Sequence, residues 1–140
     1  MGSEARLSHR SRLLVSIQGN VAVAYCFGTL DSSVVEDLSE RARALSFDGV
    51  RGLVCSLERV SHIHFQALDA ILGLHKIMRD AGGRLLMAGA SSYLRQILDF
   101  GGIPEQVPVL ADSSQAVESL MLEPPADNDM LGTAAQPSFF

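Results

Sequence analysis

The chain has 140 residues, of which 47% are hydrophobic and 19% charged, and its formal net charge is −5 at pH 7. These values are typical of one globular domain and exclude a largely disordered chain. The negative balance disfavours binding to nucleic acid or to an anionic membrane through bulk charge. No apolar run is long enough to cross a bilayer, so we expect no direct membrane insertion.

The two cysteines, Cys26 and Cys55, lie inside apolar runs and form no Cys-x-x-Cys motif. Such cysteines indicate small buried side chains in a reducing compartment, and not a disulfide scaffold. The N-terminal residues also lack the apolar core of a signal peptide. The sequence therefore predicts a cytoplasmic protein.

The two ends of the chain differ from its middle. Residues 1–11 are polar and aperiodic, and residues 122–140 combine prolines with acidic residues. We expect both segments to be flexible and the folded domain to span residues 12–121. Phe139 and Phe140 are interpreted as part of a disordered end, with a docking peptide as the alternative.

The first elements read as a hairpin and a helix. Segments 13–17 and 21–27 are rich in β-forming residues, and Gly19-Asn20 between them predicts a turn. Ser33 and Glu36 have the spacing of a capping box, which predicts that a helix begins there.

Strand and helix patterns then alternate to residue 121. The apolar run 50–57 predicts a buried strand, and a full apolar stripe over 67–81 predicts a helix that Gly82-Gly83 ends. The later pattern predicts a strand over 84–88, a helix capped by Ser91 or Ser92, an edge strand over 107–110 and a last helix opened by Asp112 and Gln115.

The resulting order, ββαβαβαβα, predicts an α/β fold. Its sheet is small, mixed and mostly parallel, because each crossover after the hairpin is strand–helix–strand. If successive strands add on the same side, all helices pack on one face of the sheet.

Recognisable catalytic and cofactor motifs are few. The sequence lacks the standard dinucleotide, nucleoside-triphosphate and serine-hydrolase motifs, and we expect no cofactor. His62 and His64 are two residues apart on an extended segment and project to the same side, which is the pattern of a metal-ligand pair. A tight metal site needs a third ligand, and none is evident. A metal-dependent enzyme using this pair is kept as an alternative. His75 lies at the edge of an apolar helix and is interpreted as an interior or boundary residue whose hydrogen bonds are satisfied.

Five short segments occur in a characteristic order along the chain: 28–31 (Gly-Thr-Leu-Asp), 60–63 (Val-Ser-His-Ile), 81–85 (Ala-Gly-Gly-Arg-Leu), 91–98 (Ser-Ser-Tyr-Leu-Arg-Gln-Ile-Leu) and 101–103 (Gly-Gly-Ile). Through these segments and their order, residues 13–121 resemble the STAS domain, a family named for sulfate transporters and anti-sigma factor antagonists. The resemblance implies a mixed sheet with helices on one side and a binding module that is not an enzyme. In the anti-sigma branch such a cytoplasmic module binds an anti-sigma factor kinase, which phosphorylates a serine in an Asp-Ser-Ser-Gly motif.

This sequence departs from the family at that motif. His64, Phe65, Gln66 and Ala67 stand in place of Asp-Ser-Ser-Gly, so Gln66 occupies the phospho-acceptor position. A glutamine has no hydroxyl to accept phosphate, and it lacks the charge of about −1.5 to −2 that a phosphate would bring. We therefore expect a partner contact that is not controlled by phosphorylation at the usual serine. Other serines, such as Ser61, remain open as acceptors.

The resemblance also implies where a protein partner binds. The expected contact residues are Asp31, Ser32, His64, Phe65, Gln66 and Ser92, with Phe65 either exposed or in the core. The partner is an anti-sigma factor kinase or a stressosome-type protein. The alternative is a small STAS subunit bound to the ATPase of a lipid-transport ABC complex. The oligomeric state is left open.

Overall fold

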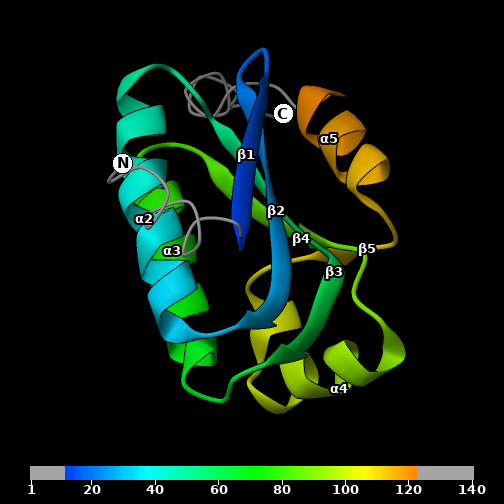
Figure 1. Cartoon of the computed structure of the whole chain (residues 1–140). Coiled ribbons are helices and arrows are strands. Elements are labelled where there is room, and N and C mark those ends of the chain that lie inside the picture. The colour runs from blue at the N-terminus through cyan, green and yellow to red at the C-terminus, as the bar shows by residue number, and fades with distance from the viewer. Residues whose placement is uncertain (1–11, 123–140) are drawn as a thin grey trace, which may run out of the picture.

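The strands of the sheet lie side by side in sequence order. The computed structural model describes residues 12–122, and its strands are ordered β1-β2-β3-β4-β5 (Figure 1). β1 pairs with β2 in antiparallel fashion, and each later pair of neighbours is parallel. The predicted α/β class and the order ββαβαβαβα are confirmed. The segments expected to be flexible lie outside the described residues, except for Leu122, which ends the last helix.

The bounds of the elements are close to those that the sequence predicts. In chain order they are β1 (Leu13–Gln18), β2 (Val21–Leu30), α2 (Ser32–Phe47), β3 (Gly52–Ile63), α3 (Ala67–Asp80), β4 (Arg84–Ala88), α4 (Ser92–Phe100), the 3-10 turn η1 (Ile103–Glu105), β5 (Val109–Leu110) and α5 (Ser113–Leu122). Within the described part of the chain, no helix is long and apolar enough to cross a membrane.

The hairpin turns at Gly19 and Asn20, as predicted. Its register runs without a break from Leu13 opposite Cys26 to Gln18 opposite Val21. Gly19 has φ +63°, a left-handed conformation that glycine adopts without strain and that tight hairpin turns need. Because the hairpin reverses the chain, the start of β1 lies beside the carboxyl end of β2.

The main core lies between one face of the sheet and helices α2, α3 and α4. Each of these helices links two parallel strands, and right-handed crossovers place successive helices on the same face. Leu38 of α2, Leu74 of α3 and Leu98 of α4 are fully buried in one cluster with Leu53 and Leu85 of the sheet. Figure 1 shows α2 and α3 together on the left of the sheet.

The last helix corrects the expectation that all helices pack on one face. α5 lies on the opposite face, where Ala116 is buried against Val23, Val54 and Leu86 (right of the sheet in Figure 1). The handedness of crossovers determines the packing face only of a helix that links two parallel strands. It does not determine the face of α5, because α5 follows the last strand. The alternate residues of the buried strands are also apolar on the second face, so that face needs a cover.

The start of α2 differs from the predicted capping box. Asp31 is the N-cap, since the Val34 N–H donates to Asp31 Oδ1 at 3.0 Å and the Ser33 hydroxyl donates to the same oxygen at 2.8 Å. The helix therefore begins earlier than the Ser33–Glu36 pair predicts. A carboxylate is favoured there because it accepts charge-assisted hydrogen bonds and complements the helix dipole. The predicted caps of α4 and α5, Ser91 and Asp112, are confirmed.

Strand β3 is longer than the predicted segment 50–57. It continues to Ile63 because β2 also continues, to Leu30, and the two residues pair at their ends. Two register shifts in this stretch give β3 more residues than β2. Gly28 has φ +77° beside the second shift, a conformation that other residues adopt at a cost. The extension carries His62 past the end of β4 and towards α4.

Cys26 and Cys55 are free thiols buried on the main core face, with their Sγ atoms 3.6 Å apart. Their interpretation as small buried side chains is confirmed. The contact with Cys26 and the loss of water both raise the pKa of the Cys55 thiol above its usual range. The thiol of Cys55 therefore stays protonated at neutral pH.

Candidate functional site

The segments that follow three parallel strands meet at one edge of the sheet. Asp31 follows β2, His64 follows β3, and Ser92 begins the helix that comes after β4. The His64 N–H donates to the Leu30 carbonyl at 2.8 Å, which joins the first two segments. The carboxyl edge of a parallel sheet commonly holds binding sites, because side chains from several loops converge there.

Asp31 is engaged by its neighbours at this edge. Its Oδ2 lies 3.0 Å from an Arg12 guanidinium nitrogen, and Arg12 also donates to the Thr29 carbonyl. Partial burial alone would raise the pKa of Asp31. The hydrogen bonds from the Val34 N–H, Ser33 and Arg12 outweigh that effect and lower the pKa to about 2. Asp31 is thus a charged helix cap that fixes the position of the loop.

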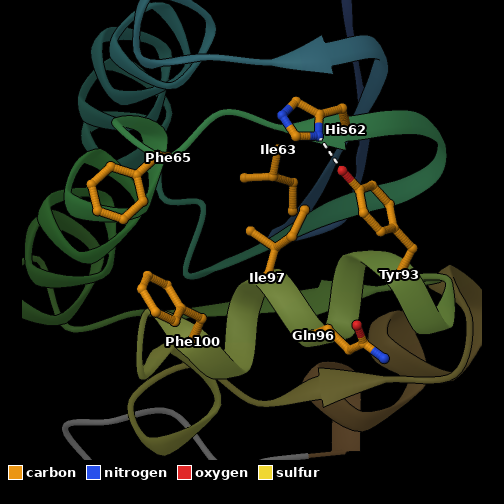
Figure 2. Close-up of a pocket in the computed structure, with 7 residues that line it drawn as sticks. All are labelled: His62, Ile63, Phe65, Tyr93, Gln96, Ile97 and Phe100. Atoms are coloured by element: carbon orange, nitrogen blue, oxygen red, sulfur yellow. Dashed lines mark hydrogen bonds between the residues drawn. The ribbon is translucent and has the colours of Figure 1, made fainter.

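Two exposed phenylalanines form the most prominent apolar feature of the edge. Phe65 lies in the turn before α3, and Phe100 ends α4; their side chains are 66% and 75% exposed. The ring centroids are 5.9 Å apart at an interplanar angle of 47°, a favourable tilted arrangement. Figure 2 shows the two rings facing each other across the gap between the helices. Of the two readings of Phe65, exposed or core, the structure supports the exposed one.

His62 links the end of β3 to the first turn of α4. Its Nδ1 lies 2.7 Å from the Tyr93 hydroxyl, and the two rings stack with centroids 5.8 Å apart (Figure 2). Both side chains are at the surface. This pair holds the far end of β3 against α4.

The two aromatic pairs border a shallow pocket of about 320 Å³. Its walls are apolar apart from the imidazole, the phenol and one amide, and they consist of His62, Ile63, Phe65, Tyr93, Gln96, Ile97 and Phe100 (Figure 2). A second hollow of about 260 Å³ lies on the other side of Phe65 and Phe100 and includes Gln66 and Asp69. The phenylalanine pair is therefore a ridge between two hollows, a shape that suits a protein surface with complementary projections.

Gln66 is the residue before α3 and is exposed. It makes no side-chain capping hydrogen bond, and its N–H donates to His64 Nδ1 at 3.3 Å. The side chain lines the second hollow. Its neutral amide is thus available to a partner at the amino end of a helix.

The two predicted serines lie at helix starts and line neither hollow. Ser92 is exposed in the first turn of α4, and Ser32 is half-buried in the first turn of α2. The structure therefore brings Phe65 and Gln66 into the centre of the candidate site, with His64 beside them, and leaves the serines at its margin.

Sequence reasoning missed four residues of α4. Tyr93, Gln96, Ile97 and Phe100 face the pocket, whereas Leu94 and Leu98 enter the core. The spacing of 93, 97 and 100 is a second apolar stripe at helical period, beside the core stripe at 94 and 98. A helix of nine residues with two apolar stripes was the signal for a second contact surface.

Two of the histidines, His62 and His64, form hydrogen bonds with neighbouring groups. His62 binds Tyr93 and His64 Nδ1 accepts from Gln66, while His75 lies on α3. Among the residues that the structure describes, no group of three or more metal-ligating side chains is found. His75 is half-buried at the boundary of the core, but the expectation that its hydrogen bonds are satisfied is wrong, because its Nδ1 is buried with no partner in the described region. Burial, with a contribution from Arg79, lowers the pKa of His75.

Comparison with known proteins identifies the class. The family model of the STAS domain matches residues 12–116, which is well over half of the chain. The protein therefore belongs to the STAS domain family, as the sequence resemblance predicts.

Solved structures agree on the fold. The anti-sigma factor antagonist SpoIIAA, in its unphosphorylated form, matches with a TM-score of 0.67 and 20% identity, over 78% of this chain and 96% of that one. SpoIIAA is elsewhere described as a Bacillus cell fate determinant. An anti-sigma factor antagonist from Mycobacterium paratuberculosis matches with a TM-score of 0.66 and 17% identity, over 78% and 92% of the two chains. A STAS domain protein from Planctomyces limnophilus is similar with a TM-score of 0.66 and 19% identity, over 78% of this chain and 97% of that one.

Proposed function

We propose that this protein is a non-enzymatic binding module that regulates a protein partner of the anti-sigma factor kinase type in the cytoplasm. The partner contacts the ridge of Phe65 and Phe100 and the hollows beside it. The contact residues predicted from the sequence form its centre and margin: Asp31, Ser32, His64, Phe65, Gln66 and Ser92. Membership of a family with anti-sigma factor antagonists among its structural relatives supports this class of function.

The observation that carries the proposal is the exposed pair of Phe65 and Phe100. Large aromatic side chains at the centre of an interface often account for much of the binding free energy. One ring comes from the turn before α3 and the other from the end of α4, and they already contact each other, so little side-chain freedom is lost when a partner binds.

The proposal also states that the contact is not gated by phosphorylation at residue 66. The Gln66 amide has no hydroxyl, so a kinase cannot place a phosphate on it. It also lacks the negative charge that would imitate the phosphorylated state at the amino end of α3. Residue 66 therefore always has the uncharged state that permits the partner to bind.

Affinity purification from the source cell tests the proposal with matched variants. The bait is the full chain, as the natural sequence, as Phe65→Ser/Phe100→Ser, or as Phe47→Ser. Phe47 is 94% exposed at the far end of α2, so its change removes an even more exposed ring elsewhere. We expect a kinase-like protein to be recovered with the natural chain and with Phe47→Ser. Its affinity for the double variant should fall by at least about tenfold.

Two results would contradict the proposal. One is equal loss of the kinase with the Phe47 and Phe65/Phe100 variants, and the other is specific recovery of an ABC transporter ATPase, which would favour the alternative function. The recovered kinase and ATP then test the gating: mass spectrometry should find no phosphate on residues 64–67, and phosphate there would refute it. Phosphate on Ser32 or Ser61 would instead identify another acceptor.

A further inference from the structure

Within the described residues, the edge strand β1 carries none of the sequence features that usually protect a sheet edge. Its six residues, Leu-Leu-Val-Ser-Ile-Gln, include no charge and no proline, and its register with β2 contains no bulge. Leu14 and Ile17 are 61% and 56% exposed. Natural proteins blunt an edge strand with lysine, proline or a bulge, because an open strand pairs readily with another strand.

The hydrogen-bonding pattern shows which backbone groups of β1 face outward. The Phe27 N–H donates to the Arg12 carbonyl at 3.0 Å, so Arg12 turns its backbone groups towards β2. In an antiparallel pair this orientation alternates along the strand. Leu13, Val15 and Ile17 therefore direct their N–H and C=O groups away from β2, to the open edge of the described sheet.

We propose that this edge binds a second copy of the same chain, through antiparallel pairing of the two β1 strands about a two-fold axis at Val15. Val15 then lies opposite Val15 of the second copy, and Leu13 lies opposite Ile17 of the second copy. In this register every outward-facing residue of β1 has a partner in the second copy, and each opposed pair exchanges two backbone hydrogen bonds. A register displaced by two residues would leave one of them unpaired.

The side chains fit this pairing as well. Leu13, Val15 and Ile17 are on the main core face; Leu13 is buried in that core and Val15 packs against it. Pairing would bring Ile17, which is exposed at the end of the strand, against Leu13 of the second copy. Since β1 carries no charge, no like charges are opposed across the two-fold axis. A symmetric interface of this kind needs a self-complementary surface, and this register supplies one.

Sedimentation velocity of the full chain over a wide range of concentration tests the proposal. We expect the natural chain to sediment as a dimer. Ile17→Lys puts a charge on the edge, as natural edges do, and should weaken self-association by at least about tenfold. The matched control is Phe47→Lys, which replaces an even more exposed apolar side chain by the same charge and should sediment like the natural chain.

A second variant and a second measurement make the test specific to the strand. Val15→Pro removes an outward N–H that no neighbour in the described sheet uses, and it should abolish the dimer while circular dichroism stays that of the folded chain. If the Val15→Pro variant does not fold, the sedimentation of Ile17→Lys alone decides whether β1 forms the dimer interface. Amide exchange at Leu13, Val15 and Ile17 should slow as concentration rises. A natural chain that stays monomeric, or a dimer that survives Ile17→Lys, would overturn the proposal. A dimer lost with Phe65→Ser but kept with Ile17→Lys would assign self-association to the candidate site instead.

Discussion

The guanidinium of Arg12 lies 3.0 Å from the carboxylate of Asp31 and joins the start of the hairpin to the cap of α2. The two residues are 19 apart in sequence and meet because β1 runs back along β2. This ion pair therefore ties the start of β1 to the start of α2, at the carboxyl end of the parallel strands where the candidate site lies.

Acid should weaken the fold through Asp31. Its pKa of about 2 is below the value of about 3.9 for an unfolded aspartate, so the unfolded chain binds the proton more readily. The stabilisation is complete above about pH 5 and is lost progressively as pH falls through 4 and then through 2. Asp31→Asn keeps a capping side chain but removes the charge. Urea denaturation of the variant should show a smaller loss of stability between pH 4 and 2 than the natural chain, and an equal loss would contradict this account.

The exposed phenylalanines should matter for binding and little for stability. Phe65→Ser or Phe100→Ser should change the free energy of unfolding by about 1 kcal/mol or less, because most of each ring is already in water. Leu98→Ala, which empties a fully buried position on the same helix as Phe100, should cost about 2–5 kcal/mol. Chemical denaturation measures all three. A large loss for either phenylalanine variant would mean that the ridge is part of the core.

Gln66→Glu should separate stability from binding. A carboxylate at the amino end of α3 interacts favourably with the helix dipole, so the variant should be more stable by about 0.3–1 kcal/mol at low salt. The same charge imitates part of a phosphate and should weaken the proposed partner contact. Thermal unfolding and calorimetric titration with the purified partner check the two effects. Unchanged affinity would remove Gln66 from the contact surface.

Two glycines should respond in opposite ways to alanine. Gly73 lies within α3, and a Cβ there meets nothing within 4 Å, so Gly73→Ala should stabilise the fold by about 0.5–1 kcal/mol. At Gly83 a Cβ would clash with the backbone carbonyl oxygen of Arg51, so Gly83→Ala must displace the backbone just before β3 and should destabilise the fold. Melting temperatures of the two variants test this contrast, which fails if both shift in the same direction.

Much of the fold is predictable because local signals agree with the topology. Gly19-Asn20 marks the hairpin, and Ser91 and Asp112 cap the helices that they are expected to cap. The side of the sheet that α5 covers was not predictable from the crossovers, because no strand follows that helix. The capping-box spacing of Ser33 and Glu36 predicts a start of α2 two residues too late, because the carboxylate of Asp31 is the N-cap.

The candidate site was predictable only in part. The resemblance to the family located Phe65 and Gln66, whereas the contacts of Phe100 with Phe65 and of Tyr93 with His62 join separate elements of the fold. The apolar stripe of α4 marks a second surface but not the residues that this surface meets. The continuation of β3 to Ile63 depends on pairing with β2, and that pairing brings His62 to Tyr93. Long-range pairing thus decided the composition of the pocket, and single-sequence patterns do not contain it.

The reversal of the chain in the hairpin has a practical consequence for probes and tethers. Arg12 lies beside Asp31, whereas Met121 of α5 reaches the turn at Gly19, at the other end of the strands. A fluorophore or surface linkage near Arg12 would lie at the same end of the sheet as the candidate site, and one near Met121 would lie at the opposite end. Immobilisation for affinity measurements is therefore best directed to the α5 side of the molecule.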